Sequence, residues 1–128
     1  MIKEFIPYEQ ALELKELGFD EECLAKYFDF KRFTNSPRFS IIYGDYENYF
    51  KNSNLSEDNI SAPLWQQAFD WFTSLGYHSY IEGAYPWFRY YINSEDNRWE
   101  GYKHLKIEEA RLECLKKLIE IVSNKTEK

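Results

Sequence analysis

The residues best suited to binding chemistry lie in one aromatic run, Tyr85-Pro86-Trp87-Phe88-Arg89-Tyr90-Tyr91-Ile92. Neighbouring residues of a strand point to opposite faces of a sheet, so this run places aromatic side chains on both faces. One face must pack on helices, and the other is exposed or covered by a loop. Aromatic side chains on an exposed sheet, with Arg89 and Arg98 among them, are similar to the platforms on which nucleotides stack. We take Trp87, Arg89 and Tyr91 as candidate ligand-binding residues.

Two other interpretations of the aromatic run stay open. Core and cross-strand packing is the simplest, and a protein interface is the second, because Trp, Tyr and Arg are enriched at interface centres. Base stacking is opposed by the net charge of −6, from 16 basic and 22 acidic residues, since phosphate backbones are bound by Lys and Arg. The run also lacks a ribonucleoprotein motif. We therefore expect no nucleic-acid partner.

Arg111 is a charged residue that the helical phase places on an apolar face. Ile107, Cys114, Leu115 and Leu118 define that face. A guanidinium there needs a partner or a path to water. Its position near the start of a helix suits an anionic small molecule, bound through phosphate or carboxylate beside the aromatic strands, so Arg111 is the fourth candidate ligand-binding residue. An internal pair with an acid, or a stem packed on Tyr or Trp, is the structural alternative.

Acidic residues are concentrated in the N-terminal sixth of the chain. Glu9, Glu13 and Glu16 follow one helical stripe, and residues 20–22 are all acidic. A solvated helix face is the simplest interpretation, because like charges at this spacing cost on the order of tenths of a kcal/mol. A docking surface for a basic partner is the alternative.

The sequence carries no motif for catalysis or for a metal. It lacks a nucleophile elbow, a Gly-rich phosphate loop and an H-E-x-x-H pattern, and His78 and His104 are far apart in sequence. A histidine pair brought together by the fold could bind a metal or move protons, but structural histidines are more common. Cys23 and Cys114 lack C-x-x-C spacing, which predicts two buried, reduced thiols. We therefore expect no enzyme, no metal and no cofactor.

Three segments have the apolar periodicity of helices: residues 8–17, 63–75 and 107–122. The first two end in Leu-Gly-aromatic, at Gly18 and Gly76, where a left-handed glycine closes a helix. This shared ending hints at an internal repeat, although common capping chemistry explains it equally well. We expect Ser61 to cap the second helix. That helix should form the centre of the core through its large aromatic residues, Trp65, Phe69, Trp71 and Phe72.

Segments rich in Tyr, Phe, Trp and Ile predict strands at residues 23–30, 39–43, 78–82, 87–93 and 98–103. Turn-forming residues at 31–38 and 94–97 predict hairpins, and the polar stretch 52–59 predicts a loop. Short connections favour a mainly antiparallel sheet with helices on one face, an α+β fold in the order helix, strands, helix, strands, helix. A length of 128 residues with 44% apolar content predicts a single compact domain over residues 1–128.

Three blocks of the sequence form a recognisable set: PYEQALELKELGFD (7–20), APLWQQAFDWF (62–72) and EEARLECLKKLIE (108–120). In order and spacing the set resembles a family of short uncharacterised proteins encoded by phages and prophages of gut anaerobic bacteria. The blocks frame nearly the whole chain. The resemblance implies an origin, with no catalytic or binding residues to transfer. One departure is Lys106-Ile107, where the family would have Thr or Ser followed by Tyr, and this weakens the expected cap of the third helix.

These observations lead to one expected function and two alternatives. We expect a small non-enzymatic phage or prophage accessory protein that binds a host protein, or forms a homodimer, through its aromatic surface. The first alternative is a protein that sequesters a nucleotide signal of host defence, and the second is a hydrolase without a recognisable motif. An exposed aromatic patch would favour binding of a host protein or a homodimer. A closed polar and aromatic cavity would favour the nucleotide-sequestering protein, and converging titratable groups would favour the hydrolase. No signal peptide or membrane-length apolar run is present, so we expect a cytoplasmic protein without a membrane partner.

Overall fold

The computed structural model describes residues 4–29, 39–44, 49–56 and 59–126 of the 128-residue chain. Its elements follow the order helix, strands, helix, strands, helix, and the strands form two three-stranded antiparallel sheets rather than one. The predicted α+β class is confirmed. The chain divides into two compact units, Met1–Ala68 and Phe69–Lys128. The expectation of a single domain over residues 1–128 stays a prediction.

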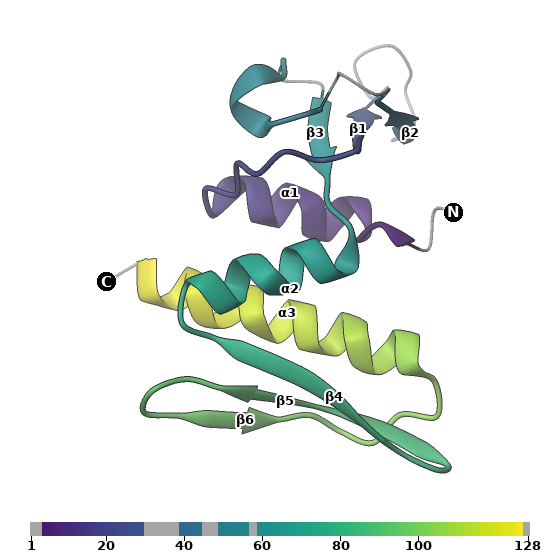
Figure 1. Cartoon of the computed structure of the whole chain (residues 1–128), viewed down its shortest axis with the longest axis vertical. Helices are drawn as coiled ribbons and strands as arrows, with labels where there is room; N and C mark the ends of the chain where they lie inside the picture. The colour runs from purple at the N-terminus through teal and green to yellow at the C-terminus, as the bar shows by residue number, and fades with distance from the viewer. Residues whose placement is uncertain (1–3, 30–38, 45–48, 57–58, 127–128) are drawn as a thin grey trace. The chain divides into compact units, whose positions relative to one another are not determined.

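The first unit contains a sheet in the order β2-β1-β3 (Figure 1). Helix α1 (Tyr8–Glu16) precedes the central strand β1 (Ala25–Asp29), which pairs on one side with β2 (Phe39–Tyr43) and on the other with β3 (Asn59–Ala62). The Tyr27 hydroxyl donates to the Ile6 carbonyl oxygen at 2.7 Å. This bond ties the central strand to the residues before α1. The first two predicted strands are thus confirmed, while the predicted turn at 31–38 lies outside the described residues.

Strand β3 begins where the sequence predicts a loop, so that prediction is wrong there. All four β3 residues are buried, although Asn59 and Ser61 are polar. The 3-10 helix η3 (Asn52–Asn54) lies before β3. The Asn52 amide donates to the Phe19 carbonyl oxygen and accepts from the Ser61 backbone N–H, both at 2.9 Å. Side-chain hydrogen bonds therefore order a stretch that has few apolar anchors.

Helix α2 (Trp65–Ser74) starts later than residue 63, the predicted first residue. Ser61 lies in β3 and does not cap it, so the predicted cap is wrong. Instead, the Gln67 side chain reaches back and accepts the backbone N–H of Leu64 at 3.4 Å, as one half of a capping box does. Phe72 is fully buried, as expected for a core residue. The other three aromatic residues of this helix are only half-buried: Trp65, Phe69 and Trp71.

Left-handed glycines close the first two helices, as predicted. Gly18 has φ +97° and Gly76 has φ +101°. The next residue's N–H donates to a carbonyl five residues earlier, at 2.9 Å from Phe19 and 3.0 Å from Tyr77. The strand orders of the two units differ, however, because the first strand is central in one sheet and the second strand is central in the other. Common capping chemistry therefore explains the shared ending without a duplicated unit.

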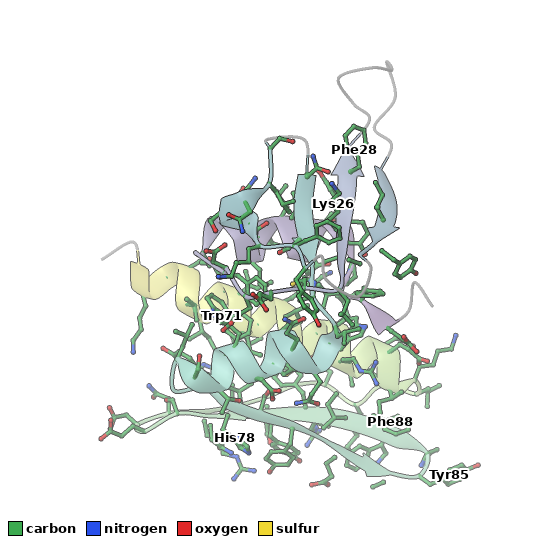
Figure 2. The ribbon with its side chains drawn as sticks, turned by 45° about the horizontal axis from the view of Figure 1, so that its top comes forward. Lys26, Phe28, Trp71, His78, Tyr85 and Phe88 are labelled. Atoms are coloured by element: carbon green, nitrogen blue, oxygen red, sulfur yellow. The ribbon has the colours of Figure 1, made fainter. Side chains whose placement is uncertain are left out.

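The second unit contains a meander in the order β4-β5-β6, with one face covered by helix α3 (Figures 1 and 2). Its elements have these bounds: β4 (His78–Ala84), β5 (Trp87–Asn93), β6 (Arg98–Glu100) and α3 (Ile107–Thr126). Strand β6 ends before the predicted residue 103, although His104 and Phe88 exchange backbone hydrogen bonds of 2.7 and 2.8 Å further along. Between the Tyr90–Gly101 and Phe88–His104 pairings, the segment after β6 has one residue more than β5. The resulting bulge lets the chain leave the sheet toward α3.

Candidate binding surface

The face of the β4-β5-β6 sheet opposite α3 gathers the predicted strand residues. We call it the outer face. It consists of Lys103, which lies over the Trp87 ring, and of the side chains that the pairing register aligns there: His78, Tyr80, Glu82, Ala84, Trp87, Arg89, Tyr91, Asn93, Arg98 and Glu100. Figure 2 shows His78 pointing away from α3. Residues on the inner face lie toward α3. Tyr90 is one of them: burial, and then the nearby Glu113 carboxylate of α3, raise its pKa to about 12. Trp87, Arg89 and Tyr91 therefore share one surface.

Trp87 lies beneath two cations on the outer face. The Arg89 guanidinium carbon is 5.5 Å from the centroid of the Trp87 ring, and the Lys103 ammonium nitrogen is 4.8 Å from it. Both distances are within the range in which a cation is attracted to an aromatic face. Arg89 also lies 4.0 Å from the Glu100 carboxylate. A tryptophan, two cations and a carboxylate thus form one connected group.

Tyr91 is covered by its neighbours on either side. The Tyr80 ring stacks on it across the β4–β5 pair, with centroids 5.1 Å apart and planes at 22°. The Arg98 guanidinium carbon lies 5.0 Å from the Tyr91 centroid. Only 8% of Tyr91 is exposed. The candidate list made from the sequence lacks Tyr80 and Lys103, although a two-residue turn at Tyr85-Pro86 would already have aligned Tyr80 with Tyr91.

Arg111 does not join the other three predicted site residues. It lies on α3, which covers the inner face, whereas Trp87, Arg89 and Tyr91 are on the outer face. Arg111 is half-buried and is not without a partner. The helical phase placed it correctly beside Cys114 and Leu115, but one aromatic strand cannot reveal which of its faces a helix covers. The structure therefore does not bring Arg111 to the surface that Trp87, Arg89 and Tyr91 share, and ligand binding by these residues stays a prediction.

The two histidines are on opposite faces of the sheet. His78 is exposed on the outer face, while His104 pairs with inner-face Phe88. His104 Nε2 donates to the Glu113 carboxylate, and its Nδ1 lies 3.8 Å from the Glu109 carboxylate. The described residues hold no group of three His, Cys, Asp or Glu side chains suited to a metal ion. The structure therefore does not form a histidine pair, and His104 links β5 to α3.

Both cysteines are free and buried, as predicted. Burial raises the pKa of the Cys114 thiol to about 12 and that of Cys23 to about 11. Thiols with such values stay protonated at neutral pH and are poor nucleophiles. Neither cysteine is suited to covalent catalysis.

The turn between β4 and β5 carries the most exposed aromatic side chain of the described residues. Tyr85 is 101% exposed at this turn, beside a cis Tyr85–Pro86 peptide bond (Figure 2).

No helix in the described part of the chain has the length and apolar character needed to cross a membrane. Comparison with known families, with curated proteins and with solved structures finds no match to this chain.

Proposed function

We propose that this chain is a non-enzymatic accessory protein that binds a partner protein through the outer face of the β4-β5-β6 sheet. The observation that carries the proposal is the group of cation-bearing aromatic residues on a face that α3 leaves uncovered, with Tyr85 fully exposed at its edge. Trp, Tyr and Arg are the residue types that contribute most binding energy at protein interfaces.

Protein binding fits the outer face better than nucleotide binding does. A stacked base needs an open aromatic ring, but Tyr91 is already covered by Tyr80 and Arg98, and Trp87 carries two cations. A base would have to displace these contacts before it could stack. A protein surface can instead pack against the edges of the group and pair with its charges.

The charges of the outer face favour an acidic partner. Arg89, Arg98 and Lys103 supply three positive charges against two carboxylates, Glu82 and Glu100, which leaves 3 − 2 = +1 on the face while the chain as a whole carries −6. Complementary charge guides partners together and rejects wrong ones. A homodimer through this face would bring like charges together, so we favour a different protein. The resemblance to phage and prophage proteins supports a host protein as that partner.

Charge reversal on the outer face tests this proposal. Wild type, Arg98→Glu/Lys103→Glu and a control, Lys116→Glu on the exposed side of α3, are immobilised and incubated with lysate of a gut anaerobic host. We expect an acidic protein that wild type and Lys116→Glu retain and that the double variant loses. Thermal unfolding of each protein checks that all three are folded. Equal capture by all three, or retention only of nucleotides, would overturn the proposal.

A further inference from the structure

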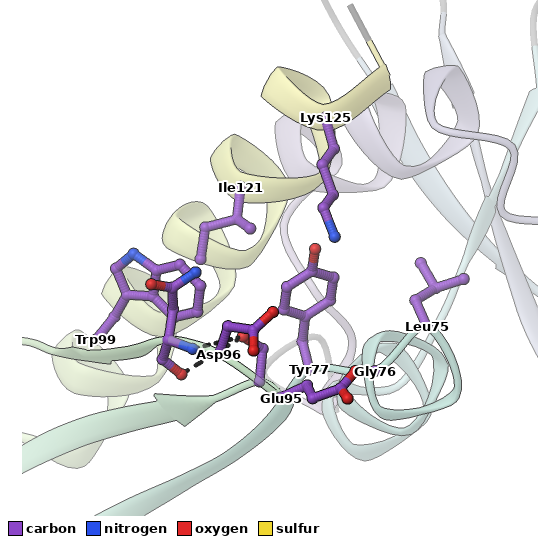
Figure 3. Close-up of a pocket in the computed structure, with 10 residues that line it drawn as sticks. Leu75, Gly76, Tyr77, Glu95, Asp96, Trp99, Ile121 and Lys125 are labelled. Atoms are coloured by element: carbon purple, nitrogen blue, oxygen red, sulfur yellow. Dashed lines mark hydrogen bonds between the residues drawn. The ribbon is translucent and has the colours of Figure 1, made fainter. Parts of the chain in front are cut away.

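A cavity of about 340 Å³ lies at the end of the second unit that carries the β5–β6 turn (Figure 3). It is formed by the end of α2, the β5–β6 turn, the first half of β6 and the last turns of α3. Trp99 of β6 belongs to the inner face, so this cavity is separate from the outer face described above. Its volume suits one small ligand or one side chain of a partner.

The base of the cavity is aromatic. The Tyr77 and Trp99 rings have centroids 6.3 Å apart and planes at 56°, so they form two sides of an angle. Tyr77 is only 5% exposed and follows the left-handed cap of α2, which fixes its backbone. An angled pair of electron-rich rings is the arrangement that holds alkylammonium groups.

The rim of the cavity is acidic. Glu95 and Asp96 occupy the tip of the β5–β6 turn, which is closed by the Ser94 N–H donating to the Asn97 carbonyl oxygen at 2.8 Å. Within the described residues, neither carboxylate takes part in an ion pair. Figure 3 shows Asp96 reaching toward the Tyr77 ring. Two carboxylates beside two aromatic rings give the cavity a preference for a positive charge.

A cation from the chain itself already occupies part of the cavity. The Lys125 ammonium nitrogen, from the last turn of α3, lies 5.5 Å from the Tyr77 centroid (Figure 3). We propose that the cavity binds an alkylammonium group, which takes the place of Lys125 over the Tyr77 ring. The group comes from a free amine or from a lysine side chain of a partner. This inference is independent of the proposed function, because it uses different residues on a different face.

The test follows the Trp99 indole N–H signal in proton–nitrogen spectra, assigned with Trp99→Phe. The probes are cadaverine and Nα-acetyl-lysine amide, with Nα,Nε-diacetyl-lysine amide, which has no free amine and is neutral, as the control. We expect the amines to shift the signal and the neutral control to leave it in place. A shift with the lysine amide alone identifies a partner side chain as the source, and a shift with cadaverine alone identifies a free amine. An equal shift with the neutral control would overturn the proposal.

Two variants test the exchange with Lys125 and leave the Tyr77 and Trp99 rings unchanged. Lys125→Ala removes the competing cation and should tighten amine binding about two- to fivefold. Lys116→Ala removes the same charge elsewhere on α3 and serves as the matched control. Glu95→Gln/Asp96→Asn should weaken binding by at least about twofold. The substituted side chains are all exposed, so each variant should still fold. Weaker binding by Lys125→Ala, or equal gains in both lysine variants, would contradict exchange with Lys125.

Discussion

Tyr80 and Tyr91 stack across the β4–β5 pair, with ring centroids 5.1 Å apart and planes at 22°. The pair is directly opposed in the register, and Arg98 lies over the same Tyr91 ring. One tyrosine thus contacts a neighbouring ring and a cation on the face of the sheet opposite α3. The residues that stabilise the β4-β5-β6 sheet on this face are therefore also residues of the candidate binding surface.

Truncation of Tyr80 should therefore destabilise the protein measurably. We expect Tyr80→Ala to cost about 0.5–1.5 kcal/mol in urea unfolding, the usual contribution of an aromatic pair. Tyr85→Ala is the matched control, because Tyr85 is fully exposed, and it should stay within about 0.5 kcal/mol of wild type. Equal effects of the two substitutions would mean that the Tyr80–Tyr91 stack contributes nothing.

Truncation of Phe72 should have the largest effect in α2. Phe72 is fully buried, so Phe72→Ala should cost about 3–5 kcal/mol, a large part of the stability of a protein of this size. Half-buried Phe69 should cost less when truncated in the same way. Thermal unfolding of both variants measures the difference. A melting temperature that moved only a degree or two in Phe72→Ala would show that the helix is oriented differently.

Stability should fall in alkaline solution. Burial raises the pKa values of Tyr90 and Cys114 to about 12, above their ordinary values of 10.0 and 9.0. Between pH 9 and 12 the unfolded chain has therefore lost protons that the folded chain keeps, so rising pH favours unfolding. The stabilisation is complete below pH 9 and is lost as the pH rises toward 12.

Urea unfolding across that pH range measures this loss. Tyr90→Phe and Cys114→Ala each remove one such group and should flatten the decline. Tyr85→Phe removes an exposed phenol and should leave the slope unchanged. A midpoint that held constant or rose with pH would contradict the assignment.

The acidic stripe of α1 should be dispensable for folding. Glu9 and Glu16 are exposed, and Glu13 is half-buried beside Gln10, whose amide donates to its carboxylate at 3.4 Å. Surface charges spaced along a helix contribute little and repel one another, so replacing all three by Gln should leave stability unchanged or slightly raised. Thermal unfolding checks this. If the triple variant also keeps every partner of wild type, a docking role for the stripe is excluded.

Elements whose pattern is local could be predicted from the sequence. The glycine caps at Gly18 and Gly76 follow from one residue each, and strand β5 follows from its aromatic composition. Strand β3 could not be predicted, because two of its four buried residues are polar. It is held by partners outside the strand: the Ser61 backbone N–H donates to the Asn52 amide oxygen, and the Asn59 amide donates to the Ser56 hydroxyl. The start of α2 could not be predicted, because Gln67 supplies the cap from inside the helix.

The candidate site could be predicted only in part. Alternation along β5 places Trp87, Arg89 and Tyr91 together, and the structure bears this out. The same strand carries apolar side chains on its other face, including Phe88, so its composition does not say which face α3 covers. Sequence alone therefore does not separate Arg111, on the helix that covers the inner face, from Trp87, Arg89 and Tyr91 on the outer face.

Site-specific photocrosslinking tests the central claim, protein binding through the outer face, most directly. A benzophenone amino acid replaces Tyr85 at the exposed turn in one variant and Lys116 on α3 in the other, and each is irradiated in host lysate. We predict one acidic protein crosslinked from position 85 and absent from position 116, with the adduct lost in the Arg98→Glu/Lys103→Glu background. The same adducts from both positions, or none from position 85, would contradict the account.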